Sequence, residues 1–277
     1  MNYKTIAVYL DNSVKNPQCL EFAIHLALKH NAHLRGIYAA HERPYLSHVD
    51  FSSYEMLETL KRQTEEAQQN SKRLFSAAAR KACILFEWHA LQDDVMECIK
   101  LHTCTADLAV VMQGNPDEKG GYSPKGLQEL VLVGGGRPTL FLPHAGSLST
   151  TFENIAIAWN GSRESARAVA DAHPFLLQAK NVVVLVAETQ KSNNSHNDLS
   201  DIAIRSYLSR HDIKAEIVRS NVDESDVGSW LLSATACDGA DLLICGAYGH
   251  SRAYEMVWGG VTRALLRSMN TPILMSH

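Results

Sequence analysis

The chain repeats itself, and this internal repeat limits its fold more than any other feature of the sequence. Residues 6–13 align with residues 155–162 at an offset of 149, and residues 106–111 align with residues 240–245 at an offset of 134. An internal repeat of this length indicates two copies of one structural unit. The first copy is therefore predicted to be longer by 149 − 134 = 15 residues, between its first strand and its third helix.

A small and polar segment, residues 145–150, separates the two copies and is typical of a joint between domains. We therefore expect a first domain at residues 1–144, a linker at 145–152 and a second domain at 153–277.

Strand-like and helix-like segments alternate within each copy. In the second copy, short apolar runs at residues 155–159, 182–187, 215–219 and 242–245 precede a fifth run after Pro272. Helical spacing of apolar residues separates these runs, for example at residues 200–210 and 227–237. The pattern predicts an α/β fold with two tandem open parallel five-stranded sheets, each with helices on both faces, in a Rossmann-like arrangement.

Composition excludes several classes of protein. The chain has 26 Lys and Arg against 30 Asp and Glu, a formal charge of −4, so it has no basic surplus for nucleic acid. Its longest apolar runs, such as residues 182–187, fall far short of the ~20 residues of a membrane span, and no secretory signal is evident. Six cysteines without a Cys-x-x-Cys pair predict reduced, mostly buried thiols in a cytoplasmic protein.

The extra length of the first copy contains an apolar stripe in residues 53–81. Its members step by three and four: Leu57, Leu60, Thr64, Ala67, Ser71, Leu74 and Ala78. The stripe predicts either a coiled-coil dimerisation helix or a long second helix that rests on the sheet, and Thr64 and Ser71 favour the second interpretation.

A glycine-rich segment follows the fourth strand of the second copy. Gly246, Gly249 and Gly259 have the spacing Gly-x2-Gly-x9-Gly. The next helix begins with Gly260, Val261 and Thr262. Because ligands of open α/β sheets bind at the carboxyl ends of the strands and helix N-termini favour anions, the segment predicts a phosphate or nucleotide site. Glycines also serve tight turns that bind no ligand, which is the alternative. Arg252 is the nearest cation in the sequence.

With these motifs the chain resembles tandem universal stress proteins over nearly its whole length. The glycine spacing is similar to the ATP-binding loop of that family, and Ala158-Trp159-Asn160-Gly161-Ser162 is similar to the end of its first strand. The resemblance implies an adenine nucleotide alpha hydrolase-like fold and domains paired through their fifth strands. It implies ATP or a related adenine nucleotide as ligand, with or without Mg. The binding residues it implies are Ala158, Trp159, Asn160, Ala187, Gly246, Gly249, Gly259, Gly260, Val261 and Thr262.

Two departures from the family pattern limit this expectation. The family usually has Asp at the end of the first strand, which the first copy keeps as Asp11 and the second replaces by Asn160. The first copy in turn has Met112, Asn115 and Lys125 where the second has the three loop glycines, and only Gly126 matches. We therefore expect one nucleotide site, in the second copy, and a structural or regulatory role for the first copy.

No catalytic residue and no metal ligand are predicted. The P-loop motif is missing from the sequence. Any hydrolysis is expected to be slow, because the sequence offers no identifiable general base or magnesium ligand. Asp107 and Asp241 begin their fourth strands and are interpreted as capping residues. Cys98, His102 and Cys104 lack a fourth ligand for structural zinc.

Two functions remain open from the sequence. The first is a stress protein that binds an adenine nucleotide in its second domain. The second is an adaptor that binds no nucleotide and contacts an unknown protein partner. Pairing of the two copies inside one chain is expected in either case, and pairing of two chains is left open.

Overall fold

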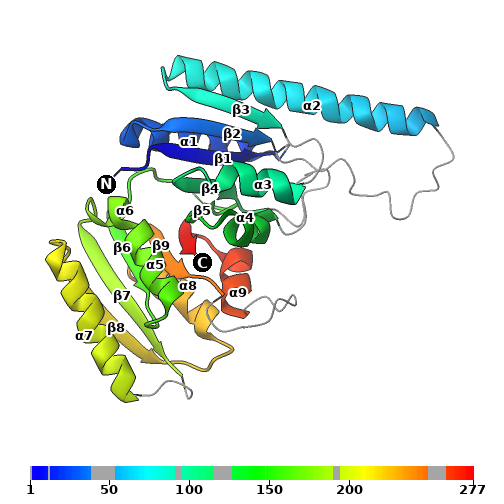
Figure 1. Cartoon of the computed structure of the whole chain (residues 1–277). Helices are drawn as coiled ribbons and strands as arrows, with labels where there is room; N and C mark the ends of the chain where they lie inside the picture. The colour runs from blue at the N-terminus through cyan, green and yellow to red at the C-terminus, as the bar shows by residue number, and fades with distance from the viewer. Residues whose placement is uncertain are drawn as a thin grey trace. The chain divides into compact units, whose positions relative to one another are not determined.

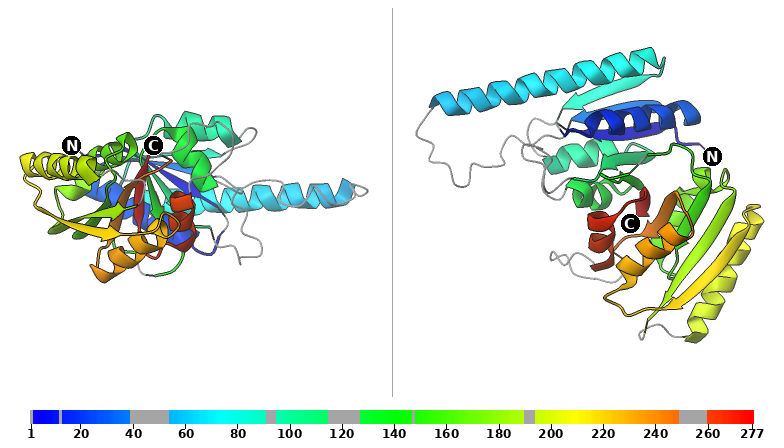
Figure 2. Two further views of the ribbon diagram at one scale, coloured as in Figure 1. Left: turned by 90° about the horizontal axis from the view of Figure 1, so that it is seen from below. Right: turned by 180° about the vertical axis from the view of Figure 1, so that it is seen from behind.

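The computed structural model describes residues 2–11, 13–38, 54–90, 95–114, 127–146, 148–189, 194–248 and 260–277. The chain divides into two compact units, an N-terminal unit of residues Asn2–Arg137 and a C-terminal unit of residues Pro138–His277 (Figures 1 and 2). In the part that the structure describes, no helix has the length and apolar character that crossing a membrane would require.

The N-terminal unit is a parallel sheet with helices packed against it. Its strands are β1 (Thr5–Leu10), β2 (His33–Tyr38), β3 (Phe86–Ala90) and β4 (Leu108–Met112). Its helices are α1 (Asn16–His30), α2 (Tyr54–Lys81), α3 (Val95–Thr103) and α4 (Leu127–Gly135). The strands pair in parallel in the order β3-β2-β1-β4.

The C-terminal unit repeats this order. Its strands are β5 (Thr139–Leu142), β6 (Asn154–Ala158), β7 (Asn181–Glu188), β8 (Ala215–Asn221), β9 (Leu242–Gly246) and β10 (Ile273–Ser276). Its helices are α5 (Arg163–Asp171), α6 (His173–Leu176), α7 (Asn194–Arg210), α8 (Val227–Cys237) and α9 (Gly260–Ser268). Strands β8-β7-β6-β9 take the places of β3-β2-β1-β4, and β10 extends the parallel order beside β9. The prediction of an α/β fold with parallel sheets is confirmed.

Strand β5 belongs to the C-terminal unit because it pairs antiparallel with β10. Leu140 lies opposite Leu274, and both side chains are fully buried. The contact boundary between the units therefore falls between Arg137 and Pro138, before the linker expected at residues 145–152. The division into domains 1–144 and 153–277 stays a prediction.

Both units use an aspartate at the start of the fourth strand in the same way. The carboxylate of Asp107 accepts hydrogen bonds from the backbone N–H groups of Lys4 and Thr5, at 2.7 and 2.9 Å. Asp241 likewise accepts from Asn154, at 3.1 Å, and from the residue before it, at 2.8 Å. The prediction that these two aspartates are capping residues is confirmed.

Helix α2 rests on the sheet with only part of its length. In its second half, Ser71, Phe75 and Ala79 are buried, and Phe75 packs closely on Gly36 of β2. Most described side chains of its first half are exposed, and α2 extends past β2 and β3 in Figures 1 and 2. The prediction of a long helix on the sheet is confirmed for the second half. The predicted stripe is wrong at Leu74, which is 51% exposed, because Phe75 takes the inward position.

The cysteines differ from expectation in their exposure. None of the five whose side chains the structure describes forms a disulfide, but Cys83, Cys104 and Cys237 are exposed. Only Cys19 and Cys245 are buried, and burial raises the pKa of the Cys245 thiol to about 12. The prediction of mostly buried thiols is therefore wrong for these five.

We expect the apolar contacts of β5 to contribute strongly to stability. Phe141 is fully buried and lies opposite Ile273, so Phe141→Ala should lower the free energy of unfolding by about 3–5 kcal/mol. Leu177→Ala, at a side chain 52% exposed, is the control and should change it by less than about 1 kcal/mol. Urea denaturation measures both, and equal losses would contradict the assignment of β5 to the core.

Candidate functional site

The carboxyl ends of β6 and β9 form the candidate site. In the order β10-β9-β6-β7-β8, the chain leaves β6 toward β7 on one side and returns to β9 on the other. Ligands of open α/β sheets bind at such a point, where the strand order reverses. Ala158, which ends β6, lies opposite Cys245, and Gly246 follows at the end of β9 (Figure 1).

Trp159 and Asn160 continue from β6 over this edge. The backbone N–H of Trp159 donates to the carbonyl of Leu185, at 2.9 Å, and its indole Nε1 donates to Ser200 Oγ of α7, at 2.8 Å. Asn160 Oδ1 accepts from the backbone N–H of Ser162, at 3.1 Å. The indole is therefore held in place, and Asn160 uses its oxygen to form the turn that leads into α5.

The turn itself depends on Gly161. This residue has φ +70°, and a Cβ atom there would lie 2.7 Å from Ser200 Oγ. Ser162 then caps α5, because its side chain accepts from the backbone N–H of Ser165, at 3.2 Å. The Asn-Gly-Ser sequence thus places the first turn of α5 at the edge of the sheet.

Gly246 is required by the close packing of α5. A Cβ atom at Gly246 would lie 2.5 Å from the backbone nitrogen of Ser165 and 2.6 Å from the carbonyl carbon of Glu164. The structure shows that this glycine receives the first turn of a neighbouring helix, and its predicted contact with phosphate stays a prediction.

The structure adds two charged residues that sequence reasoning missed. Glu164 is only 4% exposed, and its carboxylate accepts a hydrogen bond from Nε of Arg163, whose side chain is 87% exposed. Burial acts to raise the pKa of Glu164, but the hydrogen bonds from Arg163 and Ser162 outweigh it, and the pKa lies below its usual value. An ionised carboxylate paired with an exposed cation therefore begins the helix whose first turn packs on Gly246. An acid in the first turn was the only sequence signal, and it is common to most helices.

The remaining predicted residues are partly described. Gly260 begins α9, Val261 follows, and Thr262 is buried. A Cβ atom at Gly260 would meet open space. Gly249, Gly259 and the cation Arg252 lie outside the described residues.

Ala187 lies one strand away from the other predicted residues. Leu185 of β7 is opposite Ala158, so Ala187 lies beyond the end of β6 along the same edge. It faces Ser220 on β8. The structure therefore brings Ala158, Trp159, Asn160 and Gly246 together and places Ala187 beside them.

The N-terminal unit has the same turn after its first strand as the C-terminal unit, but it lacks the glycine at the end of the fourth strand. Asp11 Oδ1 accepts from the backbone N–H of Ser13, at 2.9 Å, as Asn160 does from Ser162. Met112 ends β4 at the position that Gly246 has in β9.

Residues 151–277 match the model of the universal stress protein family. They form a universal stress protein domain. The described part of the candidate site lies within this domain. No curated protein sequence matches the chain.

Solved structures share the fold over the whole chain. A universal stress protein from Archaeoglobus fulgidus DSM 4304 is 13% identical, with a TM-score of 0.70, covering 98% of this chain and 95% of that one. A protein of unknown function from Pseudomonas aeruginosa PAO1 is 14% identical, with a TM-score of 0.62, covering 99% and 92%. A universal stress protein solved in complex with cAMP is 20% identical over 46% of this chain and 98% of its own, with a TM-score of 0.36.

Substitution of Gly246 tests the packing of α5 in this universal stress protein domain. We expect Gly246→Ala to lower the free energy of unfolding by about 1–3 kcal/mol, because the new Cβ meets backbone atoms that cannot move freely. Gly260→Ala is the control, since its Cβ meets open space, and it should change stability by less than about 0.5 kcal/mol. Urea denaturation would contradict the packing if the two variants were equally stable.

Proposed function

We propose that the chain is a tandem universal stress protein that binds ATP or a related adenine nucleotide in its C-terminal unit. The observation that carries the proposal is the edge where β6 and β9 end side by side at the reversal of strand order, with the family's loop spacing beginning at Gly246. Action in a stress response without fast catalysis, in the cytoplasm, is part of the same proposal.

Four features support this function over a plain scaffold. Trp159 is fixed by Ser200, and Ala158 and Ala187 offer small side chains beside it, which suits a flat base. Helix α9 begins at Gly260, where backbone N–H groups without helical partners attract an anion. Met112 replaces Gly246 in the N-terminal unit, which supports a single site.

A tandem arrangement has support of its own. The strand order of the N-terminal unit recurs in the C-terminal unit, and Asp107 and Asp241 make matching hydrogen bonds. The antiparallel pairing of β5 with β10 supports pairing of the repeats through their fifth strands.

An adaptor without nucleotide is the second candidate, and helix α7 favours it. Leu199 and Ile202 are 68% and 63% exposed and lie one turn apart on this helix. Exposed apolar side chains at this spacing suit contact with another protein.

Calorimetric titration with ATP separates the two candidates. Wild type should bind, and Gly260→Glu should bind at least about tenfold more weakly, roughly 1.4 kcal/mol, because its carboxylate repels phosphate at the start of α9. Gly260→Gln has the same size without the charge and is the matched control, expected to lose much less. A wild type that binds no adenine nucleotide would overturn the proposal and leave the adaptor.

A divalent cation fits the site only together with the nucleotide. Across the described ranges, no group of three or more His, Cys, Asp or Glu side chains is arranged to hold a metal ion. Mg²⁺ commonly binds through one or two carboxylates plus phosphate oxygens, and Glu164, whose backbone and Cβ lie close to Gly246, would supply one such carboxylate. When bound, the ion would neutralise charge between Glu164 and the phosphates.

We therefore expect Glu164→Gln to change the dependence of ATP affinity on Mg²⁺. Wild type should bind more tightly in MgCl₂ than in EDTA, and the variant should show a ratio near one. Glu153→Gln is the control, because this acid is exposed and pairs with Lys180 away from the site. A variant that keeps the wild-type ratio would exclude Glu164 as the cation ligand.

A further inference from the structure

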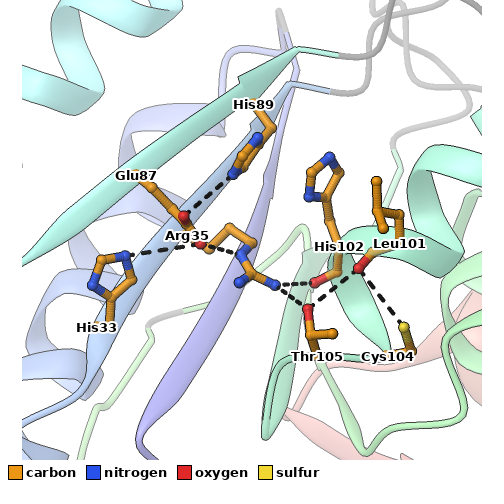
Figure 3. A network of polar contacts seen from close by, with 8 residues as sticks. All are labelled: His33, Arg35, Glu87, His89, Leu101, His102, Cys104 and Thr105. Atoms are coloured by element: carbon orange, nitrogen blue, oxygen red, sulfur yellow. Dashed lines mark hydrogen bonds and ion pairs between the residues drawn. The ribbon is translucent and has the colours of Figure 1, made fainter.

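A compact group of charged side chains lies on one face of β2 and β3 in the N-terminal unit. Arg35 of β2 is opposite Glu87 of β3, and His33 and His89 flank this pair on the same two strands. Figure 3 shows these four side chains with His102 of α3 beside His89. The proposed nucleotide site uses none of them.

One carboxylate is shared among three bases. Glu87 accepts from Arg35 Nε, and its oxygens lie 3.9 Å from His33 Nε2 and 3.5 Å from His89 Nε2. Burial acts to raise the pKa of Glu87, yet hydrogen bonds from Arg35 and His89 lower it below its usual value. Glu87 therefore stays ionised at mildly acidic pH, and Arg35 balances its charge.

Arg35 also holds the end of α3. Its Nη1 donates to the backbone carbonyl of His102, at 2.6 Å, and to Thr105 Oγ1, at 2.7 Å. The rings of His89 and His102 stack with centroids 4.0 Å apart and an interplanar angle of 27°. The end of α3 thus contacts the sheet through one arginine and one pair of imidazoles.

We propose that the contact of His102 with His89 is pH-sensitive: it keeps the end of α3 on β3 while the His102 ring is neutral and releases it when that ring is protonated. An imidazolium at His102 would lie stacked on His89 and beside Arg35, with only the single negative charge of Glu87 to offset the positive charge. Ile99, a fully buried residue of α3, would gain exposure on release.

The direction of the pH effect follows from His102. Burial lowers its pKa, His89 and Arg35 lower it further, and Glu87 acts in the opposite direction. The packed state therefore favours the neutral ring of His102. When α3 is released, the pKa of this ring returns to its ordinary value of ~6.5. Acidification below that value favours the released state, and the contact is fully favourable above it.

The test is local because other histidines also respond to acid. His30 is fully buried with its pKa lowered to about 4, so global unfolding would mix several groups. Backbone hydrogen exchange of α3, corrected for the intrinsic pH dependence of exchange, should show at least about tenfold less protection at pH ~5.5 than at pH ~7.5. NMR titration of the imidazoles follows the same protonation directly.

His89→Gln should raise the pKa of His102 toward its ordinary value, because His89 acts to lower it. The pH-dependent loss of α3 protection should become smaller in His89→Gln, where burial and Arg35 still lower the His102 pKa, and should disappear in His102→Gln. His25→Gln, at an exposed position of α1, is the control and should behave as wild type. The proposal would be overturned if the His102 titration were unchanged in His89→Gln, or if both variants lost as much α3 protection on acidification as wild type does.

Discussion

Two aspartate carboxylates set where the central strands of both sheets begin. Parallel strands are joined by long crossovers, so no tight turn fixes their register. Asp107 and Asp241 supply that restraint by binding backbone N–H groups at the start of β1 and β6. Because the start of a strand determines where it ends, the same hydrogen bonds place Ala158 and Gly246 at one edge. The candidate site therefore depends on an interaction at the opposite end of the sheet.

The fold could be predicted from the sequence because its central strands are buried along nearly their whole length. Continuous apolar runs such as β9 can be recognised as strands from the sequence. The predicted bounds of α8 agree with the structure. Helix α6 was missed, since four residues are too few to show a period. The stripe of α2 was misplaced by one residue at Leu74, because the inward position depends on Gly36 of β2, which is far away in the sequence.

The candidate site was predicted in part, and the reasons differ by residue. Gly246 stood out by its spacing, but its packing against α5 is a tertiary contact that no local pattern reveals. Glu164 was overlooked because burial of a first-turn acid cannot be read from one sequence. The exchange of Asp11 for Asn160 proved conservative in geometry, since either side chain offers the oxygen that accepts from the serine two residues later. The change alters charge and preserves the turn.

The partial support of α2 has a consequence for how the chain can vary. Most side chains described in its first half are exposed, and this half has pairs such as Arg62 with Glu66, whose side chains are mostly exposed. Such surface pairs contribute only about 0.3–0.5 kcal/mol. Removal or insertion of whole turns in this stretch would leave Phe75 and the sheet beneath it unchanged. The helix is thus a projection whose length natural selection can adjust independently of the globular body that carries it.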